Sequence, residues 1–460
     1  MAKVKTLFEC TQCGTTYPKW QGNCENCSGW NTLTEKIIQK STSSLSNTFL
    51  TQSDPITIES IQVEEQDIIP TGISEFDNVL GKGIVNGSII LLGGEPGIGK
   101  STLSLQFCQQ CAQKGLKILY VTAEEGVSQI RLRAERVGPL TDTMWVYAQS
   151  DMQTILKQCD QLQPDIVLID SIQVVHHQEV SGIEGSVSQV RHCANVFLKW
   201  IKANNKAGVL IGHITKDSQL AGPKVLEHLV DVILYLEGDR QKNYRILRCN
   251  KNRFSTTQEI GLFEMKTEGL LEVTQPAEFF IDSTSTSHPG SVITPILEGN
   301  RVLLVELQAL VVKTGYGMAK RTFVGVDSHR ANLMTASIDK FLNCNLSSRD
   351  VFLNIIGGLK VNEPALDLAI IVAIISSLLD QPLAQKVAVV GEVALTGELR
   401  SVPKLENRLL ELTKMGYQKV IVPEKSKSKA ASKASIDIVY ANDVRSVIST
   451  LFRFNTGKND

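Results

Sequence analysis

The segment Ser88-Ile-Ile-Leu-Leu-Gly-Gly94-Glu-Pro-Gly-Ile-Gly99-Lys100-Ser101 is the most informative part of this 460-residue chain. An apolar run of strand length leads into the pattern G-x-x-x-x-G-K-[ST], and the residues after it suit a helix. A strand, a glycine-rich turn and a helix in this order are the context that a phosphate-binding loop requires. The segment therefore predicts an α/β domain built around a nucleotide site.

Each part of this turn has a physical task. The glycines let backbone N–H groups wrap around phosphates, and the helix start adds the positive end of its dipole. We expect the Lys100 ammonium to reach the β and γ oxygens of ATP, where it assists catalysis, and the Ser101 hydroxyl to ligate Mg²⁺. The predicted ATP-binding run comprises Gly94, Glu95, Pro96, Gly97, Ile98, Gly99, Lys100, Ser101 and Thr102.

Further apolar runs in residues 67–275 predict a mostly parallel sheet with helices on its faces. Asp170 closes one of them, where a Walker-B carboxylate would hold the magnesium shell. Glu124 and Glu125 follow another, at the carboxyl edge of the sheet, where one of them could orient and polarise water. Acidic residues also often begin a helix, which is the alternative for one or both. We favour Glu124 as the catalytic residue.

Four of the ten cysteines lie together near the N-terminus. Cys10, Cys13, Cys24 and Cys27 have the spacing C-x2-C-x10-C-x2-C, in which each pair can sit on a tight turn. Four thiolates suit tetrahedral Zn²⁺ and leave no open position for a substrate, so residues 1–35 are expected to form a structural zinc ribbon. Reduced, unligated cysteines are the alternative.

Composition limits the remaining possibilities. Lysine and arginine total 47 against 48 acidic residues, so the net charge of −1 excludes a strong global positive field, and any nucleic-acid surface must be local. The longest apolar run, residues 368–379, is shorter than the roughly 20 residues that span a bilayer. With no apolar signal sequence after Met1, we expect a cytoplasmic protein without a membrane partner.

Several motifs in a fixed order give the chain a specific resemblance. Ile69-Pro-Thr-Gly72, the phosphate loop, Thr122-Ala-Glu-Glu125, Gly212-His-Ile-Thr-Lys-Asp217 and Lys251-Asn-Arg-Phe254 follow the cysteine cluster. Together they resemble the bacterial RadA/Sms family of DNA-repair ATPases, relatives of the recombinase RecA. The resemblance spans essentially the whole chain. It implies a homohexameric, ATP-driven ring that acts on single-stranded and branched DNA, promotes branch migration and processes recombination intermediates together with RecA.

The resemblance also implies roles for single residues. Glu124 aligns with the water-activating glutamate of the RecA fold, and His213 with its γ-phosphate sensor. By its sequence context alone, at the end of an apolar run, His213 would more often be a satisfied core histidine. Lys251 and Arg253 belong to the family's own motif, which resembles the place where neighbouring subunits reach ATP, so Arg253 could act as a finger in trans. Ser255 replaces the usual glycine there and puts the backbone conformation of this loop in doubt.

Local basic segments are the candidates for DNA contact. Residues 240–253 carry six cations and no acid, and the loop after His213 lies where RecA-fold proteins present DNA. We predict DNA contacts at Lys216, Lys224, Arg248, Lys320 and Arg321. Each of these charges could equally belong to a solvated face.

Residues 276–460 resemble a Lon-protease-type domain, through segments such as Asn362-Glu-Pro-Ala-Leu-Asp367. Ala365 stands where that family has its nucleophilic serine. The dyad lysine falls at Glu406 on an ungapped reading from Gly391. Alanine cannot attack a carbonyl, and glutamate is not the amine base, so the domain is predicted to be proteolytically inactive. It is expected to assemble the ring and to add DNA-binding surface.

The predicted organisation is therefore a ribbon at 1–35, a linker at 36–66, a RecA-like ATPase domain at 67–275 and a Lon-protease-like domain at 276–460. The predicted activity is that of a DNA-dependent, helicase-type ATPase with the cofactors ATP, Mg²⁺ and Zn²⁺. Two alternatives stay open. One is a regulatory ATPase of the clock or signalling kind, which switches protein partners. The other is an ATP-dependent protease, which Ala365 and Glu406 disfavour.

Overall fold

The computed structural model describes residues 5–17, 19–38, 68–213, 226–238, 243–274, 280–281, 288–315, 318–427 and 435–452. Contacts within the chain divide it into two compact units, Met1–Glu272 and Val273–Asp460. The predicted linker at 36–66 lies almost wholly outside the described residues, as does the start of the loop after His213.

The N-terminal ribbon is a small antiparallel sheet. Its strands are β1 (Lys5–Cys10), β2 (Thr16–Tyr17) and β3 (Leu33–Ile38), in the order β2-β1-β3. The Cys10 end of β1 pairs with the Leu33 end of β3. Two short turns, at 10–14 and 24–28, are closed by the backbone bonds Gly14 N to Cys10 O and Ser28 N to Cys24 O. These turns place the four cysteines.

A nine-stranded sheet forms the centre of the nucleotide-binding domain, in the order β14-β13-β12-β11-β6-β10-β9-β7-β8. The strands from β11 to β8 in this order run parallel, which confirms the predicted parallel sheet. Their bounds are Val232–Glu237 (β11), Ile89–Gly94 (β6), Ala207–His213 (β10), Ile166–Asp170 (β9), Ile118–Thr122 (β7) and Met144–Ala148 (β8).

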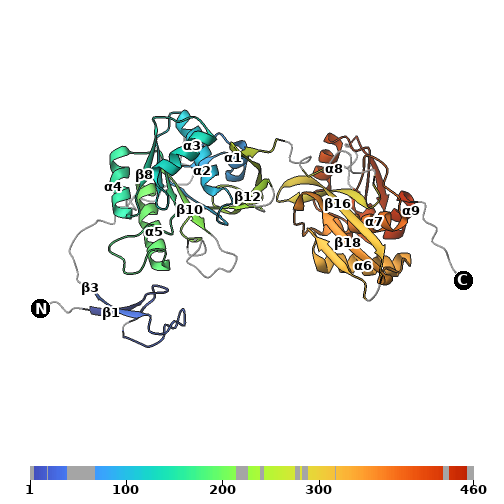
Figure 1. The fold of residues 1–460 in the computed structure, drawn as a ribbon, viewed down its shortest axis with the longest axis horizontal. Helices are drawn as coiled ribbons and strands as arrows, with labels where there is room; N and C mark the ends of the chain where they lie inside the picture. The colour runs from blue at the N-terminus through green and yellow to red at the C-terminus, as the bar shows by residue number, and fades with distance from the viewer. Residues whose placement is uncertain are drawn as a thin grey trace, which may run out of the picture. The chain divides into compact units, whose positions relative to one another are not determined.

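Helices cover both faces of this sheet (Figure 1). Side chains of β6 alternate between two separate cores: Ile90 and Leu92 pack with Phe107 and the first three helices, whereas Leu91 packs with Phe197 and the next two. Alternation within a strand makes such two-sided burial possible. The helices are α1 (Ser74–Leu80), α2 (Lys100–Gln113), α3 (Val127–Val137), α4 (Met152–Leu162) and α5 (Val187–Ala203).

An antiparallel extension, not foreseen in the sequence, completes the sheet beyond β11. It consists of β12 (Tyr244–Asn252), β13 (Ile260–Lys266) and β14 (Gly269–Glu272). Because β12 runs antiparallel to β11, with Val232 opposite Asn252, its last residues lie at the amino edge of the parallel strands. The phosphate loop follows β6 at the carboxyl edge. The Lys251–Phe254 motif and the phosphate loop therefore lie at opposite edges of the sheet.

The second unit is a mixed seven-stranded sheet, ordered β17-β18-β16-β15-β19-β22-β23, with α7 packed on β15 and β16 and α6 packed on α7. The longest apolar run of the sequence, residues 368–379, lies in α7. The strands are β15 (Ser291–Glu298), β16 (Arg301–Lys313), β17 (Arg321–Val324), β18 (Arg349–Ile355), β19 (Val387–Val389), β22 (Lys419–Pro423) and β23 (Asp437–Ala441). The helices are α6 (Ser328–Leu342), α7 (Asp367–Leu379), α8 (Leu405–Lys414) and α9 (Val444–Leu451). Within the described residues, no helix has both the length and the apolar character needed to cross a bilayer.

Candidate nucleotide site and metal ribbon

The glycine-rich turn adopts a backbone that only glycine accepts easily. Gly94, Gly97 and Gly99 have φ values of 154°, 75° and 118°. A Cβ on Gly94 would lie 2.6 Å from the Leu236 carbonyl oxygen, so this position has no room for a side chain. The turn opens onto a cavity of about 260 Å³ at the carboxyl edge of the sheet. The described residues that line it include Gly97, Gly99, Lys100, Ser101, Thr102, Thr122, Glu124, Glu125, Arg133, Asp170, His213 and Met265.

Lys100 begins α2 and is the principal cation of this cavity. Its side chain is buried, and Nζ donates to the carbonyl oxygens of Gly94 at 2.8 Å and Glu95 at 3.0 Å. Burial lowers the pKa of Lys100 to about 8, although the carboxylates of Asp170 and Glu124 oppose this shift. Among the described residues no side chain caps the N-terminus of α2, whose backbone N–H groups stay available. A buried cation beside an uncapped helix start fits a bound phosphate chain.

Asp170 ends β9 next to Ser101, as the Walker-B prediction requires. The Tyr120 hydroxyl donates to Asp170 Oδ2 at 2.7 Å, and Ser101 is a further hydrogen-bond partner of this carboxyl. Burial raises the pKa of Asp170, and the two hydrogen bonds work against that rise. The peptide bond between Asp170 and Ser171 is cis. A hydroxyl and a carboxylate side by side form an oxygen-rich corner that suits Mg²⁺.

Glu124 lies on the other side of the cavity. Its carboxylate accepts a hydrogen bond from the Ser171 hydroxyl, and its Oε1 lies 3.5 Å from His213 Nε2. The Gln173 amide donates to the His213 carbonyl oxygen at 3.3 Å. The ends of β7, β9 and β10 thus bring together three side chains that are far apart in the sequence. A carboxylate in such a cavity, with a histidine beside it, is chemically able to polarise water.

Glu125, the alternative catalytic glutamate, has a different partner. Arg133 Nη2 lies 2.7 and 2.8 Å from its two carboxylate oxygens. Sequence reasoning missed Arg133, which also lines the cavity. The available signal was its place on a helix that starts directly after the two glutamates.

Lys251 and Arg253 are remote from this cavity. Lys251 Nζ donates to the carbonyl oxygens of Glu227 at 2.6 Å and Val230 at 2.8 Å, and Arg253 pairs with Asp231. Among the described residues that line the cavity, neither cation is found. Ser255 lies outside the left-handed backbone region, and its hydroxyl fills the space that a Cβ on Gly81 would need. The replacement of glycine is therefore accommodated without a strained backbone.

The predicted DNA-contacting cations have varied surroundings. Lys216 and Lys224 lie outside the described residues. Arg248 Nε donates to Glu237 Oε2 at 2.7 Å. Lys320 is exposed, whereas the Arg321 guanidinium donates to the Leu346 carbonyl oxygen at 2.6 Å and to that of Arg349. Arg321 thus supports the turn before β18 in addition to any role with DNA.

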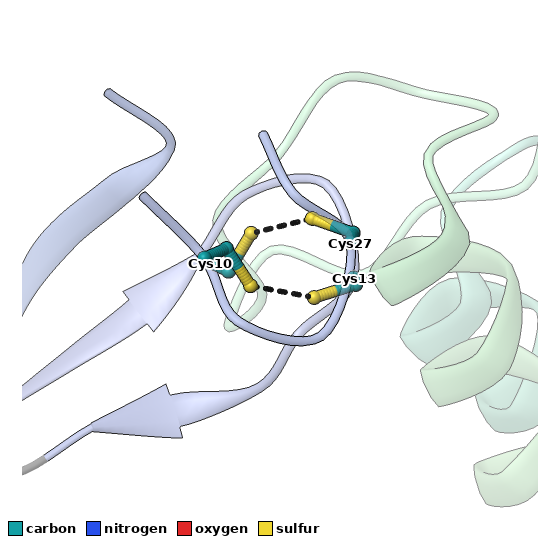
Figure 2. Close-up of side chains that lie close together, drawn as sticks. Cys10, Cys13 and Cys27 are labelled. Atoms are coloured by element: carbon teal, nitrogen blue, oxygen red, sulfur yellow. Dashed lines mark hydrogen bonds between the residues drawn. The ribbon is translucent and has the colours of Figure 1, made fainter. Parts of the chain in front are cut away.

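The four ribbon cysteines converge on one point. Their sulfurs all lie within 4.8 Å of one another, and Figure 2 shows the thiols of Cys10, Cys13 and Cys27 gathered together. Cys13 Sγ lies 3.4 Å from Cys24 Sγ, and Cys10 Sγ lies 3.5 Å from Cys27 Sγ. A tetrahedron with Zn–S bonds of about 2.3 Å has sulfurs about 3.8 Å apart, so this donor set fits zinc.

Tyr17 supports this cluster. Its hydroxyl lies 3.4 Å from Cys24 Sγ, and this hydrogen bond lowers the pKa of the Cys24 thiol to about 6. A thiolate is the form that binds a metal. Within the described residues, no other group of three or more such ligands is close enough to hold an ion.

The two positions that the sequence predicts to replace a protease dyad lie in the second unit. Ala365 is buried just before α7, and Glu406 is exposed on α8. Two residues after Glu406, Arg408 is fully buried and pairs with Glu363, two residues before Ala365. Arg408 also donates to the carbonyl oxygens of Pro295 and Pro403. A guanidinium held in this way cannot serve as a general base.

Sheet order, glycine-rich turn and cavity together define a P-loop ATPase of the RecA-like fold, joined to a cysteine ribbon and a Lon-like domain. Family models match each part. Residues 69–148 match the ATPase model described as KaiC, residues 317–426 match subunit ChlI of Mg-chelatase, and residues 8–35 match the rubredoxin metal binding domain.

Curated relatives match the chain along nearly its full length. "DNA repair protein RadA" of Bacillus subtilis (strain 168) is 40% identical over 454 residues, 98% of this chain and 99% of the relative. The protein of that name from Streptococcus pyogenes serotype M1 is 41% identical, with coverage of 98% and 100%. That of Listeria monocytogenes is 41% identical, with coverage of 95% and 97%. The chain belongs to the RadA family of DNA repair proteins, which confirms the resemblance found in its motifs.

Proposed function

We propose that this chain is a DNA-dependent ATPase of homologous recombination and repair, which acts in the cytoplasm as a homohexameric ring. It moves on single-stranded and branched DNA, promotes branch migration and processes recombination intermediates together with RecA. Family membership and the ATPase domain support the general role. The specific motor activity, the ring and the partnership with RecA are our inference from the family resemblance.

The cavity supports a division of labour in hydrolysis. The P-loop amides and Lys100 bind the phosphates, and Lys100 stabilises charge that develops on them. Ser101 and Asp170 would hold Mg²⁺, which when bound shields the β and γ phosphates. Glu124 orients and polarises the attacking water, and His213 lies beside it, where it can report the presence of the γ-phosphate. A tyrosine hydroxyl keeps the Asp170 carboxyl in place.

The placement of Lys251 and Arg253 carries the proposal of a ring. Arg253 N donates a hydrogen bond to the Asp231 carbonyl oxygen, and Asp231 N donates in turn to the Ile89 carbonyl oxygen. Arg253 therefore lies close to Ile89. Ile89 begins β6 and Gly94, the first residue of the P-loop, ends it. The two residues are therefore about 17 Å apart along the strand. These cations therefore cannot serve the nucleotide of their own subunit, but they can face the nucleotide of a neighbour.

ATP hydrolysis by the full-length protein, measured with and without single-stranded and forked DNA, tests this function. We expect DNA to stimulate hydrolysis and Glu124→Gln to abolish it while ATP binding persists. Branch migration of a three-strand intermediate, with and without RecA, then tests the motor. Hydrolysis that DNA does not stimulate would favour the regulatory ATPase instead, and degradation of casein would favour the protease.

A further inference from the structure

Two consecutive glutamates leave β7 toward different partners. Thr122 fixes the turn that separates them, because its hydroxyl donates to the Glu125 carbonyl oxygen at 2.9 Å and accepts from Glu125 N at 3.1 Å. Gln129 closes the start of α3 by accepting from Gly126 N at 3.1 Å. The turn is thus held on both sides. Glu124 faces Ser171 and His213, and Glu125 faces Arg133.

Arg133 binds Glu125 more closely than an ordinary surface pair. One nitrogen of the guanidinium contacts both carboxylate oxygens, and the arginine side chain is only 23% exposed. Arg131 on the same helix offers a contrast, since it is 70% exposed and pairs with Glu135 one turn away. The first pair lines the nucleotide cavity, and the second does not belong to the described lining.

The Arg133–Glu125 pair changes the charge balance of the cavity. Three carboxylates line a cavity that is proposed to bind the triphosphate of ATP: those of Glu124, Glu125 and Asp170. Lys100 is the cation that interacts with Asp170 and Glu124. Like charges that share one cavity repel strongly where water is partly excluded. A guanidinium that cancels one carboxylate removes repulsion against the phosphates and against the two carboxylates that have chemical tasks.

We propose that Arg133 is a positioning residue for ATP hydrolysis, which holds the Glu125 carboxylate away from the phosphates and neutralises it, so that Glu124 alone faces the attacking water. The inference rests on the proposed function of this cavity. It makes a distinctive prediction: Arg133 is needed only while Glu125 carries its charge.

A double-mutant cycle in the full-length protein tests this dependence. Steady-state ATP hydrolysis in the presence of single-stranded DNA gives kcat and KM for Arg133→Gln, Glu125→Gln and the double variant. We expect Arg133→Gln to lower kcat/KM on the order of tenfold or more, because residues in direct contact couple strongly. The double variant should return to within about threefold of Glu125→Gln, and Arg133→Lys, which keeps the charge, should retain most activity.

Arg131→Gln is the matched control, since it removes an arginine of the same helix, and it should hydrolyse ATP like the unmodified protein. Thermal melting establishes that each variant is folded, and Arg133→Ala takes the place of Arg133→Gln, alone and in the double variant, if Arg133→Gln does not fold. A double variant as slow as Arg133→Gln would overturn the proposal, because Arg133 would then act on the nucleotide itself. Full activity of Arg133→Gln would overturn it too. Persistent hydrolysis by Lys100→Ala would instead refute the proposed function of the cavity.

Discussion

Arg253 Nη1 lies 3.1 Å from Asp231 Oδ1, at the edge of the sheet opposite to the P-loop. Asp231 is buried, and its other oxygen accepts a hydrogen bond from Ile89 N at 3.1 Å. The aspartate thus anchors the arginine to the first residue of β6. Because the Arg253 side chain is still 50% exposed, much of its guanidinium can meet another subunit.

A mixing experiment follows from this anchor. Arg253→Ala should lower ATP hydrolysis on the order of 100-fold or more, as loss of an arginine finger does. Lys100→Ala should be inactive for a different reason, the loss of its own phosphate contacts. When the two inactive proteins are mixed one to one, ATP hydrolysis should return to about a quarter of the unmodified rate. About a quarter of the sites then combine an intact P-loop with a neighbour's arginine.

Lys206→Ala is the control for this experiment. Lys206 pairs with Asp165 at 3.0 Å, also at the amino edge of the sheet, so its loss removes a similar ion pair. It should leave hydrolysis within about twofold of the unmodified protein. A mixture of Lys100→Ala and Arg253→Ala that stays as inactive as its components would rule out action in trans.

Local motifs explain why much of the site could be predicted from the sequence. The P-loop, the paired cysteines and Asp170 each belong to short patterns whose chemistry depends on spacing along the chain. The parallel strands were also evident, because buried strands read as continuous apolar runs. The structure brings Lys100, Ser101 and Asp170 to one cavity, as that reading requires.

Tertiary placement explains what the sequence left open. The different surroundings of Glu124 and Glu125, with Arg133 beside Glu125, are set by the turn at Thr122 rather than by any motif. The distance between Arg253 and the P-loop depends on the direction of β12, a strand that a run of cations does not reveal. Arg321 reads as a surface cation, yet it hydrogen-bonds two backbone carbonyl groups.

Nucleotide binding should take up a proton. The pKa of Lys100 is lowered to about 8 by burial, so near pH 8 about half of these side chains are neutral in the free protein. Phosphate oxygens favour the ammonium form, and ATP affinity should therefore fall as the pH rises from about 7 to 9. Calorimetric titration in buffers of different ionisation enthalpy measures the proton uptake directly.

Lys100→Arg is the control for proton uptake, because a guanidinium remains charged throughout this range. Its binding enthalpy should not depend on the buffer at pH 8, whereas that of the unmodified protein should. The same buffer dependence in both proteins would mean that another group takes up the proton.

Zinc should hold the ribbon together without affecting the ATPase fold. Cys24→Ser removes the thiol whose pKa the Tyr17 hydroxyl lowers to about 6, and bound zinc should fall from about one equivalent to background. Proteolysis should then cut within residues 5–38 while the P-loop domain stays intact. Metal analysis and mass spectrometry of the fragments measure both effects. Cys159→Ser, which removes a buried thiol outside the ribbon, should keep its zinc.

The pair of Arg408 and Glu363, each two residues from a predicted dyad position, should stabilise the second unit. Glu363 also accepts from Leu297 N at 2.7 Å, so the pair joins α8, β15 and the segment before α7. Arg408→Met leaves the Glu363 carboxylate, whose side chain is only 14% exposed, without its partner and should cost about 3 kcal/mol of unfolding free energy, measured by denaturant titration. Lys414→Met, which breaks the exposed pair with Glu411 on the same helix, should cost less than about 1 kcal/mol.

The same pair predicts that protease activity cannot be restored by one substitution. Ala365→Ser would supply a hydroxyl, but the buried cation nearby is a guanidinium that stays protonated and is already bound to Glu363 and two carbonyl groups. Without a base the serine remains a weak nucleophile, so casein and small peptide substrates should stay intact. Hydrolysis of either substrate by Ala365→Ser would contradict this prediction, because it would show that the domain retains a working base.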